Sequence, residues 1–482
     1  MLWELFKNNL EGSFMKKIIF LSLFVMTTNA LALSINWSGG YRLEYTEIDR
    51  PTLADGKERK AYALNFLYLQ PKISASDGIN IISRFDIFAN SKAAYKNSQL
   101  GSTFGTGLGS PVGTTDNGNN VTSENQDAST LKVSQLYLNV NHEYGSFVAG
   151  RAPIEFGLGI THNAGLAPFD HWYDTKEMIG YKFVVDNISF MPILAKVYQR
   201  DFGQGVTISD QIFVFEYDNK DIGAKAGIFH QTRRSSIESN DAITPPNGLP
   251  IAAATLNGGW STQTINLFFG RSWEAFQFKL EASFLTGDTG LSVAAGAVKY
   301  NAYAVAAEML LPADSKWEFG AKVGVASGDD PSTTNTLEGY QFDKNYDVAM
   351  LLFNHRMGAK DFLTTKNIHT DASLSVGNSA DDEAIGNVVY LAPSVKYKWD
   401  EKLDIKSTLI YGQLMVNPTN SVDFSKDLGA ELDMELIYKP RERVIWSNQL
   451  GILVPGQAWK DGASNLENKL NYGITTKAAI TF

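Results

Sequence analysis

The sequence predicts an all-β chain that forms a single transmembrane antiparallel β-barrel of about 18 strands (roughly 16 to 20). Segments of about ten residues alternate apolar and polar side chains, as strands with two different faces do. The connections between these segments alternate between short and long. No run of about 18 apolar residues is present, which excludes a chain that crosses a membrane as helices. A closed barrel is then the sheet that can span a bilayer with every backbone polar group paired.

The start of the chain has the pattern of a secretory signal. Lys16 and Lys17 are basic, residues 18–26 are apolar, and Ala30 and Ala32 have the small side chains of a cleavage site. We therefore predict a signal peptide over residues 15–32, cleaved after Ala32. The alternative is an ordinary amphipathic amino-terminal helix.

Residues 1–14 do not fit this signal, because they contain the acidic Glu4 and Glu11. We predict that they are an untranslated extension and that translation starts at Met15. Residues 33–482 then form the barrel without any linker. Sequencing the amino terminus of a precursor trapped before cleavage decides the start site.

Composition excludes several classes of function. The chain has 482 residues, a net charge of −10 and no cysteine. An acidic chain lacks the basic footprint of a nucleic-acid-binding protein. Without cysteine it has no disulfide, no thiolate metal site and no lipidated amino-terminal cysteine. No cofactor or metal is expected: the acidic runs at 329–330 and 381–383 lack the glycine-spaced ligands of a calcium loop, so we interpret them as solvated loop charges.

The predicted strands follow one another along the whole chain. In the first, residues 35–46, Ile35, Trp37 and Tyr41 lie on one face, and Arg42 and Glu44 lie on the other. Equally regular alternation occurs at 276–284, 317–325, 389–399, 403–411, 428–438, 444–454 and 470–482. Each segment is a weak signal, but its repetition is typical of a membrane barrel.

The connections alternate in length in the way that a barrel requires. Short turns are predicted at 76–78, 143–145, 186–187, 219–221, 312–314, 400–402 and 440–442. Long loops are predicted at 90–130, 158–176, 199–209, 233–261, 327–345 and 455–468. This rhythm indicates short periplasmic turns, long extracellular loops and two periplasmic termini. A soluble β-sandwich, the alternative, lacks it.

Two segments leave the topology open. Residues 346–386 contribute either two strands or none, and if none, residues 327–386 form a long loop that folds into the lumen. Residues 90–130 are rich in Gly, Ser, Thr and Asn. They form either a constriction inside the barrel or an external loop, and we favour the external loop.

The end of the chain carries the most specific pattern. Its apolar side chains alternate and end in an aromatic residue: Tyr472, Ile474, Ala478, Ile480 and Phe482. This segment resembles the terminal strand of Gram-negative outer-membrane β-barrels, which the barrel-assembly machinery reads. The resemblance implies an outer-membrane location, with that machinery, membrane lipid and lipopolysaccharide as partners.

Charged residues on the polar strand faces are the candidate pore-lining residues. They are Arg84, Asp86, Arg151, Glu155, Lys182, Lys225, Lys279, Glu281, Glu431, Asp433 and Glu435. A basic arc that faces an acidic arc would set a transverse field that orients dipolar solutes. Alternatively, these charges only pair with their neighbours inside a wet barrel.

Residues 150–160 contain a glycine-arginine strand followed by an aromatic-glycine turn. Gly157 and Gly159 allow the backbone to bend where the strand meets its loop. The segment resembles that of alginate-export and porin-like outer-membrane barrels. The resemblance implies an open or gated channel, and we expect passive diffusion of small hydrophilic solutes. The patterns specify neither the solute nor the oligomeric state.

Two other functions compete with a channel. One is a plugged structural barrel whose long loops bind a partner. The other is a barrel enzyme, which needs a histidine beside a serine or a carboxylate. The six histidines are His142, His162, His171, His230, His355 and His369. None lies on a predicted strand face with an evident partner, so no enzyme is expected.

The terminal strand makes a first testable prediction. Replacing Phe482 with Asp should leave the protein degraded or aggregated in the periplasm, because the assembly machinery needs the terminal aromatic. The measurement is the yield of heat-modifiable barrel in outer-membrane fractions. An unchanged yield would contradict the assigned role of this strand.

Overall fold

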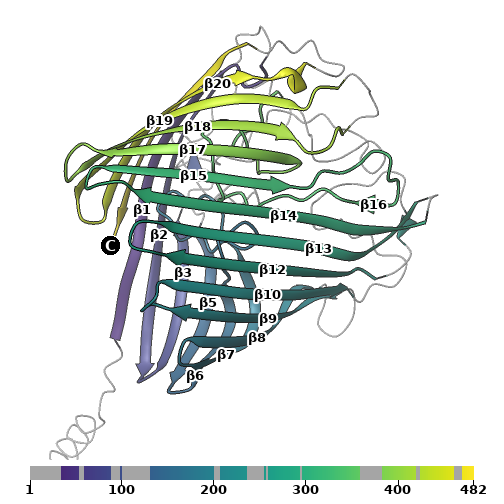
Figure 1. Ribbon diagram of the computed structural model, residues 1–482. Helices are drawn as coiled ribbons and strands as arrows, with labels where there is room; N and C mark the ends of the chain where they lie inside the picture. The colour runs from purple at the N-terminus through teal and green to yellow at the C-terminus, as the bar shows by residue number, and fades with distance from the viewer. Residues whose placement is uncertain are drawn as a thin grey trace, which may run out of the picture.

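The computed structural model describes residues 34–53, 59–87, 98–99, 131–199, 207–235, 255–256, 259–293, 296–358, 383–418, 424–460 and 469–482. Most of them form one sheet, whose wall strands pair antiparallel and close on themselves (Figure 1). The predicted signal peptide, its small residues Ala30 and Ala32, and the 1–14 extension lie outside these ranges. So do most of the 90–130 loop, His369 and the acidic pair at 381–382.

Eighteen strands make up the barrel wall, as predicted. They are Ser34–Asp49 (β1), Arg59–Ser76 (β2), Ile79–Ile87 (β3), Leu131–His142 (β5), Gly145–Pro153 (β6), Thr175–Val185 (β7), Ile188–Gln199 (β8), Thr207–Asn219 (β9), Ala224–Ser235 (β10), Ser261–Ser272 (β12), Gln277–Val293 (β13), Gly296–Pro312 (β14), Trp317–Ala326 (β15), Val388–Lys398 (β17), Leu403–Leu414 (β18), Asp427–Arg441 (β19), Val444–Pro455 (β20) and Asn471–Thr481 (β21). Three two-residue strands and one short 3-10 helix add to them: Ser98–Gln99 (β4), Thr255–Leu256 (β11), Thr336–Leu337 (β16) and Gln457–Trp459 (η1).

The first and last strands close the barrel. β1 pairs with β21 in antiparallel register, from Gly40 opposite Thr481 to Ile48 opposite Gly473. Each other wall strand pairs with its neighbours along the chain, so the wall has no free edge. The C-terminus lies at the same end of the barrel as the short turns (Figure 1). In the described part of the chain, no helix is long and apolar enough to cross a membrane.

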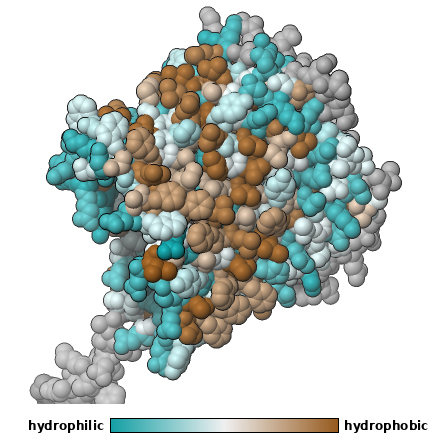
Figure 2. All heavy atoms as spheres, viewed as in Figure 1, coloured by the Kyte–Doolittle hydropathy of each residue, from teal (hydrophilic) through white to brown (hydrophobic). Residues whose placement is uncertain are grey.

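The outer face of the wall is apolar. Side chains that alternate along single strands are about half exposed there, for example Trp37 at 57% and Ile474 at 47%. Figure 2 shows these side chains as a hydrophobic band with hydrophilic residues on both sides. Tyr472, Ile480 and Phe482 also lie on this face, as the terminal pattern predicts. Polar partners such as Arg42 and Glu44 point inward and are buried.

The ambiguous segment at 346–386 adds no wall strand within its described residues. β15 pairs directly with β17, from Trp317 opposite Tyr397 to Ala326 opposite Val388. The described residues of the connection between these two strands, 327–358 and 383–387, therefore lie outside the row of wall strands. Its apolar residues Val348, Leu351 and Leu352 are buried inside the barrel.

The outer face generates a prediction about depth. Leu267 lies near the middle of β12 and is 42% exposed. Leu267→Arg should destabilise the barrel by about 2–4 kcal/mol, because it places a charge near the bilayer midplane. The matched control, Gln263→Arg, lies on the same face near the end of the strand and should cost about 0–1 kcal/mol. Urea unfolding in lipid vesicles measures both, and equal effects would contradict the assigned depth.

Candidate functional site

A first inner loop, defined as residues 154–174 between β6 and β7, lies inside the barrel rather than outside it. Phe156 packs against Phe229 of β10 and Phe268 of β12, with ring centroids 5.5 and 6.4 Å apart. Ile154 and Phe156 belong to one buried cluster with inward side chains of the wall: Val148, Ala152, Met178, Ile193, Ala195, Ile212, Phe229 and Phe268. The prediction of an external loop at 158–176 is therefore wrong, because its apolar side chains are buried against the lumen wall.

A carboxylate of the wall holds this loop. Glu281 of β13 is fully buried, and its Oε2 accepts hydrogen bonds from the backbone N–H of Leu158 at 2.6 Å and of Ile160 at 3.4 Å. The Thr161 hydroxyl donates to Oε1 of the same residue at 3.2 Å. A Cβ at Gly157 would lie 2.5 Å from Glu281 Oε2. Gly157 and Gly159 have positive φ angles of 63° and 81°, which confirms the predicted bend.

A second inner loop, defined as residues 338–358, fills the opposite side of the lumen. Its side chains Phe342, Leu351 and Leu352 are at most 2% exposed. They share a buried cluster with inward residues of the wall: Ile48, Ala302, Ala304, Ala306, Tyr390, Ile410 and Leu453. The wall is therefore apolar on both of its faces where this loop covers it.

Two more wall carboxylates hold the second inner loop. Glu431 of β19 accepts hydrogen bonds from the backbone N–H of Leu351 and of Leu352, each at 2.7 Å. Asp433 accepts one from the backbone N–H of Met350 at 2.9 Å. Three successive N–H groups of a loop are thus satisfied by two side chains of one strand. Backbone donors oriented in this way form a nest that favours negative charge.

The two inner loops touch each other across the lumen. The backbone N–H of Asp343 donates to the carbonyl oxygen of Ile160 at 2.8 Å. The Asn345 side chain bonds to both backbone groups of Trp172, at 2.9 and 2.6 Å. Tyr340 lies at this contact, where burial raises its pKa to about 12. The loops therefore form one constriction within the barrel.

The first inner loop also contacts the wall at β1 and β3. His171 Nε2 lies 2.9 Å from the carboxylate of Glu44, and Arg42 donates to the carbonyl oxygen of Asp170 at 2.6 Å. The Tyr173 hydroxyl donates to Asp86 at 2.9 Å, and Asp86 accepts a further bond from Arg84 at 2.8 Å. Arg84 and Asp86 do share an inward face, as predicted, and they pair there with each other.

Most inward charges pair with neighbours in the same way. The pairs are Arg84–Asp86, Lys176–Asp210, Arg233–Asp210, Lys182–Glu216, Lys322–Glu308 and Lys396–Glu318. Lys225 lies 3.9 Å from Glu216 as well. Opposite charges are thus interspersed around the wall. This arrangement favours local pairing over the predicted separation into one basic and one acidic arc.

Arg151 and Glu155 do not share an inward face, which corrects the prediction for both. Arg151 lies opposite Leu136 and Glu177 on the outer face, where its side chain is 45% exposed and pairs with Glu177. Inward positions of β6 are held by Val148 and Ala152 instead. Glu155 lies beyond the end of β6, in the first inner loop, and is exposed.

Glu281 and Glu431 do point inward, but neither faces open space. They are 0% and 1% exposed, because the inner loops cover them. Glu281→Arg, which the sequence pattern alone would tolerate, would therefore remove three hydrogen bonds of the first inner loop. Lys279 and Glu435 line cavities instead, and Asp433 both anchors the second inner loop and lines a cavity.

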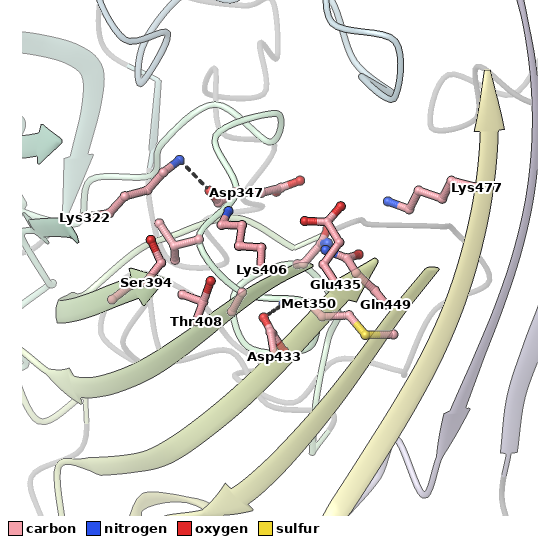
Figure 3. A pocket seen from close by; sticks show the side chains of 14 residues that line it. Lys322, Asp347, Met350, Ser394, Lys406, Thr408, Asp433, Glu435, Gln449 and Lys477 are labelled. Atoms are coloured by element: carbon pink, nitrogen blue, oxygen red, sulfur yellow. Dashed lines mark hydrogen bonds between the residues drawn. The ribbon is translucent and has the colours of Figure 1, made fainter. Parts of the chain in front are cut away.

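Two adjoining cavities lie on the inner side of the wall. One has a volume of about 150 Å³, and ten of its lining residues are labelled in Figure 3, among them Lys322, Lys406, Glu435 and Lys477. The other has a volume of about 310 Å³ and extends toward the short-turn end, where Lys279, Glu308 and Glu318 line it. Lys322, Ser394 and Lys406 line both cavities.

Among the described histidines, His162 and His355 are buried in the inner loops, and His171 lies beside the carboxylate of Glu44, a partner that the strand pattern did not predict. Burial holds the pKa of His162 and of His355 well below the ordinary value of histidine. Asp329 and Asp330 accept backbone hydrogen bonds from Glu338 and Ser332. Within the ranges that the structure describes, no three His, Asp or Glu side chains are grouped so that they could hold a metal ion.

The first inner loop was not predicted, because a period-two strand pattern describes one apolar face at a time, whereas the inward fold of residues 327–386 was one of the two predicted alternatives. A signal for them does exist in the sequence. Strands buried on both faces have continuous apolar runs, and residues 212–215 of β9, 304–307 of β14 and 452–454 of β20 have them. Such runs indicate which parts of the lumen wall are covered by chain rather than by water.

The closed sheet, its apolar outer belt and its charged lumen define a porin-like outer-membrane β-barrel. Residues 252–472 match the family model described as alginate export. The matched part does not include the segment at 150–160 that first suggested this likeness. A comparison with curated proteins finds no match.

Comparison with solved structures gives matches that include an outer membrane protein and a porin. The outer membrane protein opdK of Pseudomonas aeruginosa has a TM-score of 0.49 at 10% identity, over 93% of this chain and 98% of the other. A BenF-like porin of Pseudomonas fluorescens Pf-5 has a TM-score of 0.49 at 9% identity, with the same coverage of both chains. OccK2 (OpdF) of P. aeruginosa, solved in complex with glucuronate, has a TM-score of 0.48 at 9% identity, also over 93% and 98% of the two chains.

The loop anchor at Glu281 makes a prediction. Glu281→Ala leaves the N–H groups of Leu158 and Ile160 buried without an acceptor, which should cost about 1–3 kcal/mol. Amide hydrogen exchange at these two residues should accelerate. Lys279→Ala, the next inward position on β13, is the matched control and should leave both amides protected. Unchanged exchange in Glu281→Ala would contradict the anchoring role.

Proposed function

We propose that this barrel is a passive channel for small hydrophilic solutes across the outer membrane. The observation that carries the proposal is the pair of charged cavities inside the closed wall. They contain inward lysines and carboxylates within a membrane-spanning sheet, where such groups need water or a polar solute. The resemblance to alginate export and to porins supports transport of hydrophilic molecules without naming one.

The charges suggest how the channel would choose solutes. Lys322 and Lys406 lie on β15 and β18, while Asp433 and Glu435 lie on the adjoining β19. A polar solute could exchange its water for contacts of both signs within one short passage. An apolar solute could not make these contacts, and it would remove water from the lysines and carboxylates without replacing the lost hydrogen bonds, which is unfavourable. The passage would therefore favour polar solutes over apolar ones.

The proposed topology follows from the positions of turns and termini. The end with the short turns and the C-terminus faces the periplasm, and the ends of β8, β9 and β10 beside the longer connections face outward. Cleavage after Ala32 precedes insertion, and the barrel-assembly machinery reads the segment that ends at Phe482. The outer leaflet then places lipopolysaccharide around the outward half of the wall.

A plugged barrel is the second candidate, and one observation favours it. The two inner loops meet at the hydrogen bond between Asp343 and Ile160, and each loop buries an apolar cluster against the wall. A constriction of this kind could close the lumen completely. The barrel would then act through its outward loops as an interaction surface. We propose no catalytic role for either form.

Conductance separates the two candidates. Purified protein in a planar bilayer should show discrete conductance steps if the passage is open. Glu435→Gln should shift selectivity toward anions and Lys406→Gln toward cations, because a fixed charge enriches its counter-ions within about 8 Å at physiological salt. Glu442→Gln makes the same charge change in an exposed turn and should leave selectivity unchanged.

Two results would contradict the proposal at different points. Folded protein without any conductance would favour the plugged barrel. If the protein conducts and all three variants have the same ion selectivity, the channel function would be retained. The assignment of Glu435 and Lys406 to the narrow part of the channel would then be wrong.

A further inference from the structure

The outer face of the wall carries a row of charged residues at the end opposite the short turns. Cross-strand register joins Arg151, Glu177, Lys196, Ser209, Arg234, Ser261, Asp288 and Lys299 into one continuous row from β6 to β14. It holds four basic and two acidic side chains, so its formal charge is +2. The strands that contribute its central part, β8, β9, β10 and β12, lie side by side in the wall (Figure 1).

The centre of this row has an excess of positive charge. Arg151 pairs with Glu177 at one end, and Asp288 lies opposite Lys299 at the other. Between them, Lys196 and Arg234 lie on either side of Ser209, and Ser261 follows Arg234. We refer to these four residues as the Lys196–Ser261 patch. Both cations are exposed and both hydroxyls are half-buried.

The patch borders the apolar belt. Leu194 is 64% exposed and lies two residues from Lys196 on the same face of β8. On β9 and β10 the belt begins farther along the wall: Phe213 follows Gln211 below Ser209, and Ile228 follows Thr232 and His230 below Arg234, at 45% and 48% exposure. A long-chain ligand held by the two cations would therefore have its apolar part against Leu194 first, and against Phe213 and Ile228 farther along the wall.

We propose that the Lys196–Ser261 patch binds the phosphorylated headgroup of an outer-membrane lipid. Lysine, arginine and serine side chains donate hydrogen bonds to phosphate oxygens, and surface cations attract anionic headgroups at a membrane boundary. Lys196 and Arg234 are two strands apart, which corresponds to about 10 Å. This spacing suits a headgroup with two separate phosphates. The site explains an outward row of charges that a pore does not need.

Which leaflet supplies the lipid is inferred from the proposed topology. Binding of the lipid itself does not depend on channel activity. Binding can be measured by thermophoresis. Purified full-length barrel in nonionic detergent is titrated with diphosphoryl lipid A. Wild-type protein should bind this probe more tightly than monophosphoryl lipid A or phosphatidylglycerol. The variant K196Q/R234Q should lose about 30-fold in affinity, because it removes two surface cations.

Controls separate the site from net charge. K220Q/R443Q removes two cations from turns at the other end and should bind like wild type, and K196R/R234K should retain binding because it keeps both charges. If K196Q/R234Q fails to fold, each single Gln variant should lose about fivefold. Equal binding by wild type and the folded Gln variants would overturn the proposal. Equal binding of phosphatidylglycerol and diphosphoryl lipid A, or an equal loss in the turn control, would overturn it too.

Discussion

The structure depends on one constraint, which is that backbone N–H and C=O groups inside a bilayer need partners within the protein. The antiparallel pairing of β1 with β21 meets this requirement, since it leaves no strand of the wall with an open edge. Closure then gives every wall strand two faces. The outward face contacts lipid and must be mainly apolar, whereas the inward face is not constrained by lipid. Tyr41 and Arg42, neighbours in β1, show the two results: one is 40% exposed on the outer face, and the other is buried inside.

The same constraint applies to the chain inside the barrel. The inner loops have few strand partners of their own, so their N–H groups must find acceptors elsewhere once apolar packing has excluded water. Glu281, Glu431 and Asp433 supply those acceptors from the wall. Carboxylates that look like pore charges in the sequence are thus structural anchors, while Lys322, Lys406 and Glu435 remain beside open volume.

The wall could be predicted from the sequence because lipid imposes a simple alternation on it. Strand number, faces and short turns follow from period-two patterns, and the structure confirms them. Side-chain direction at strand ends could not be predicted as well. Arg151 has the polar character of an inward residue, but it lies at the boundary of the apolar belt, where an outward charge is also tolerated.

The path of the first inner loop could not be predicted for a different reason, and that of residues 327–386 only as one of two alternatives. A loop that folds inward owes its position to contacts with distant strands, such as Phe156 on Phe229, and no local pattern records them. The continuous apolar runs of β9, β14 and β20 show only that something covers the wall. Only the structure identifies which segment of the chain covers each of these strands.

The central claim is that water and solute reach the cavities between the inner loops and the short-turn end. The absence of native cysteine allows a direct test, because a single cysteine can be placed at Ser394, which lines both cavities. A cationic, membrane-impermeant thiosulfonate added to a bilayer that holds Ser394→Cys should change the conductance within one recording. Val395→Cys, the next residue on the opposite face of β17, should not respond. If Ser394→Cys does not react while the protein conducts, solutes do not pass through these cavities, and the account of the lumen is wrong.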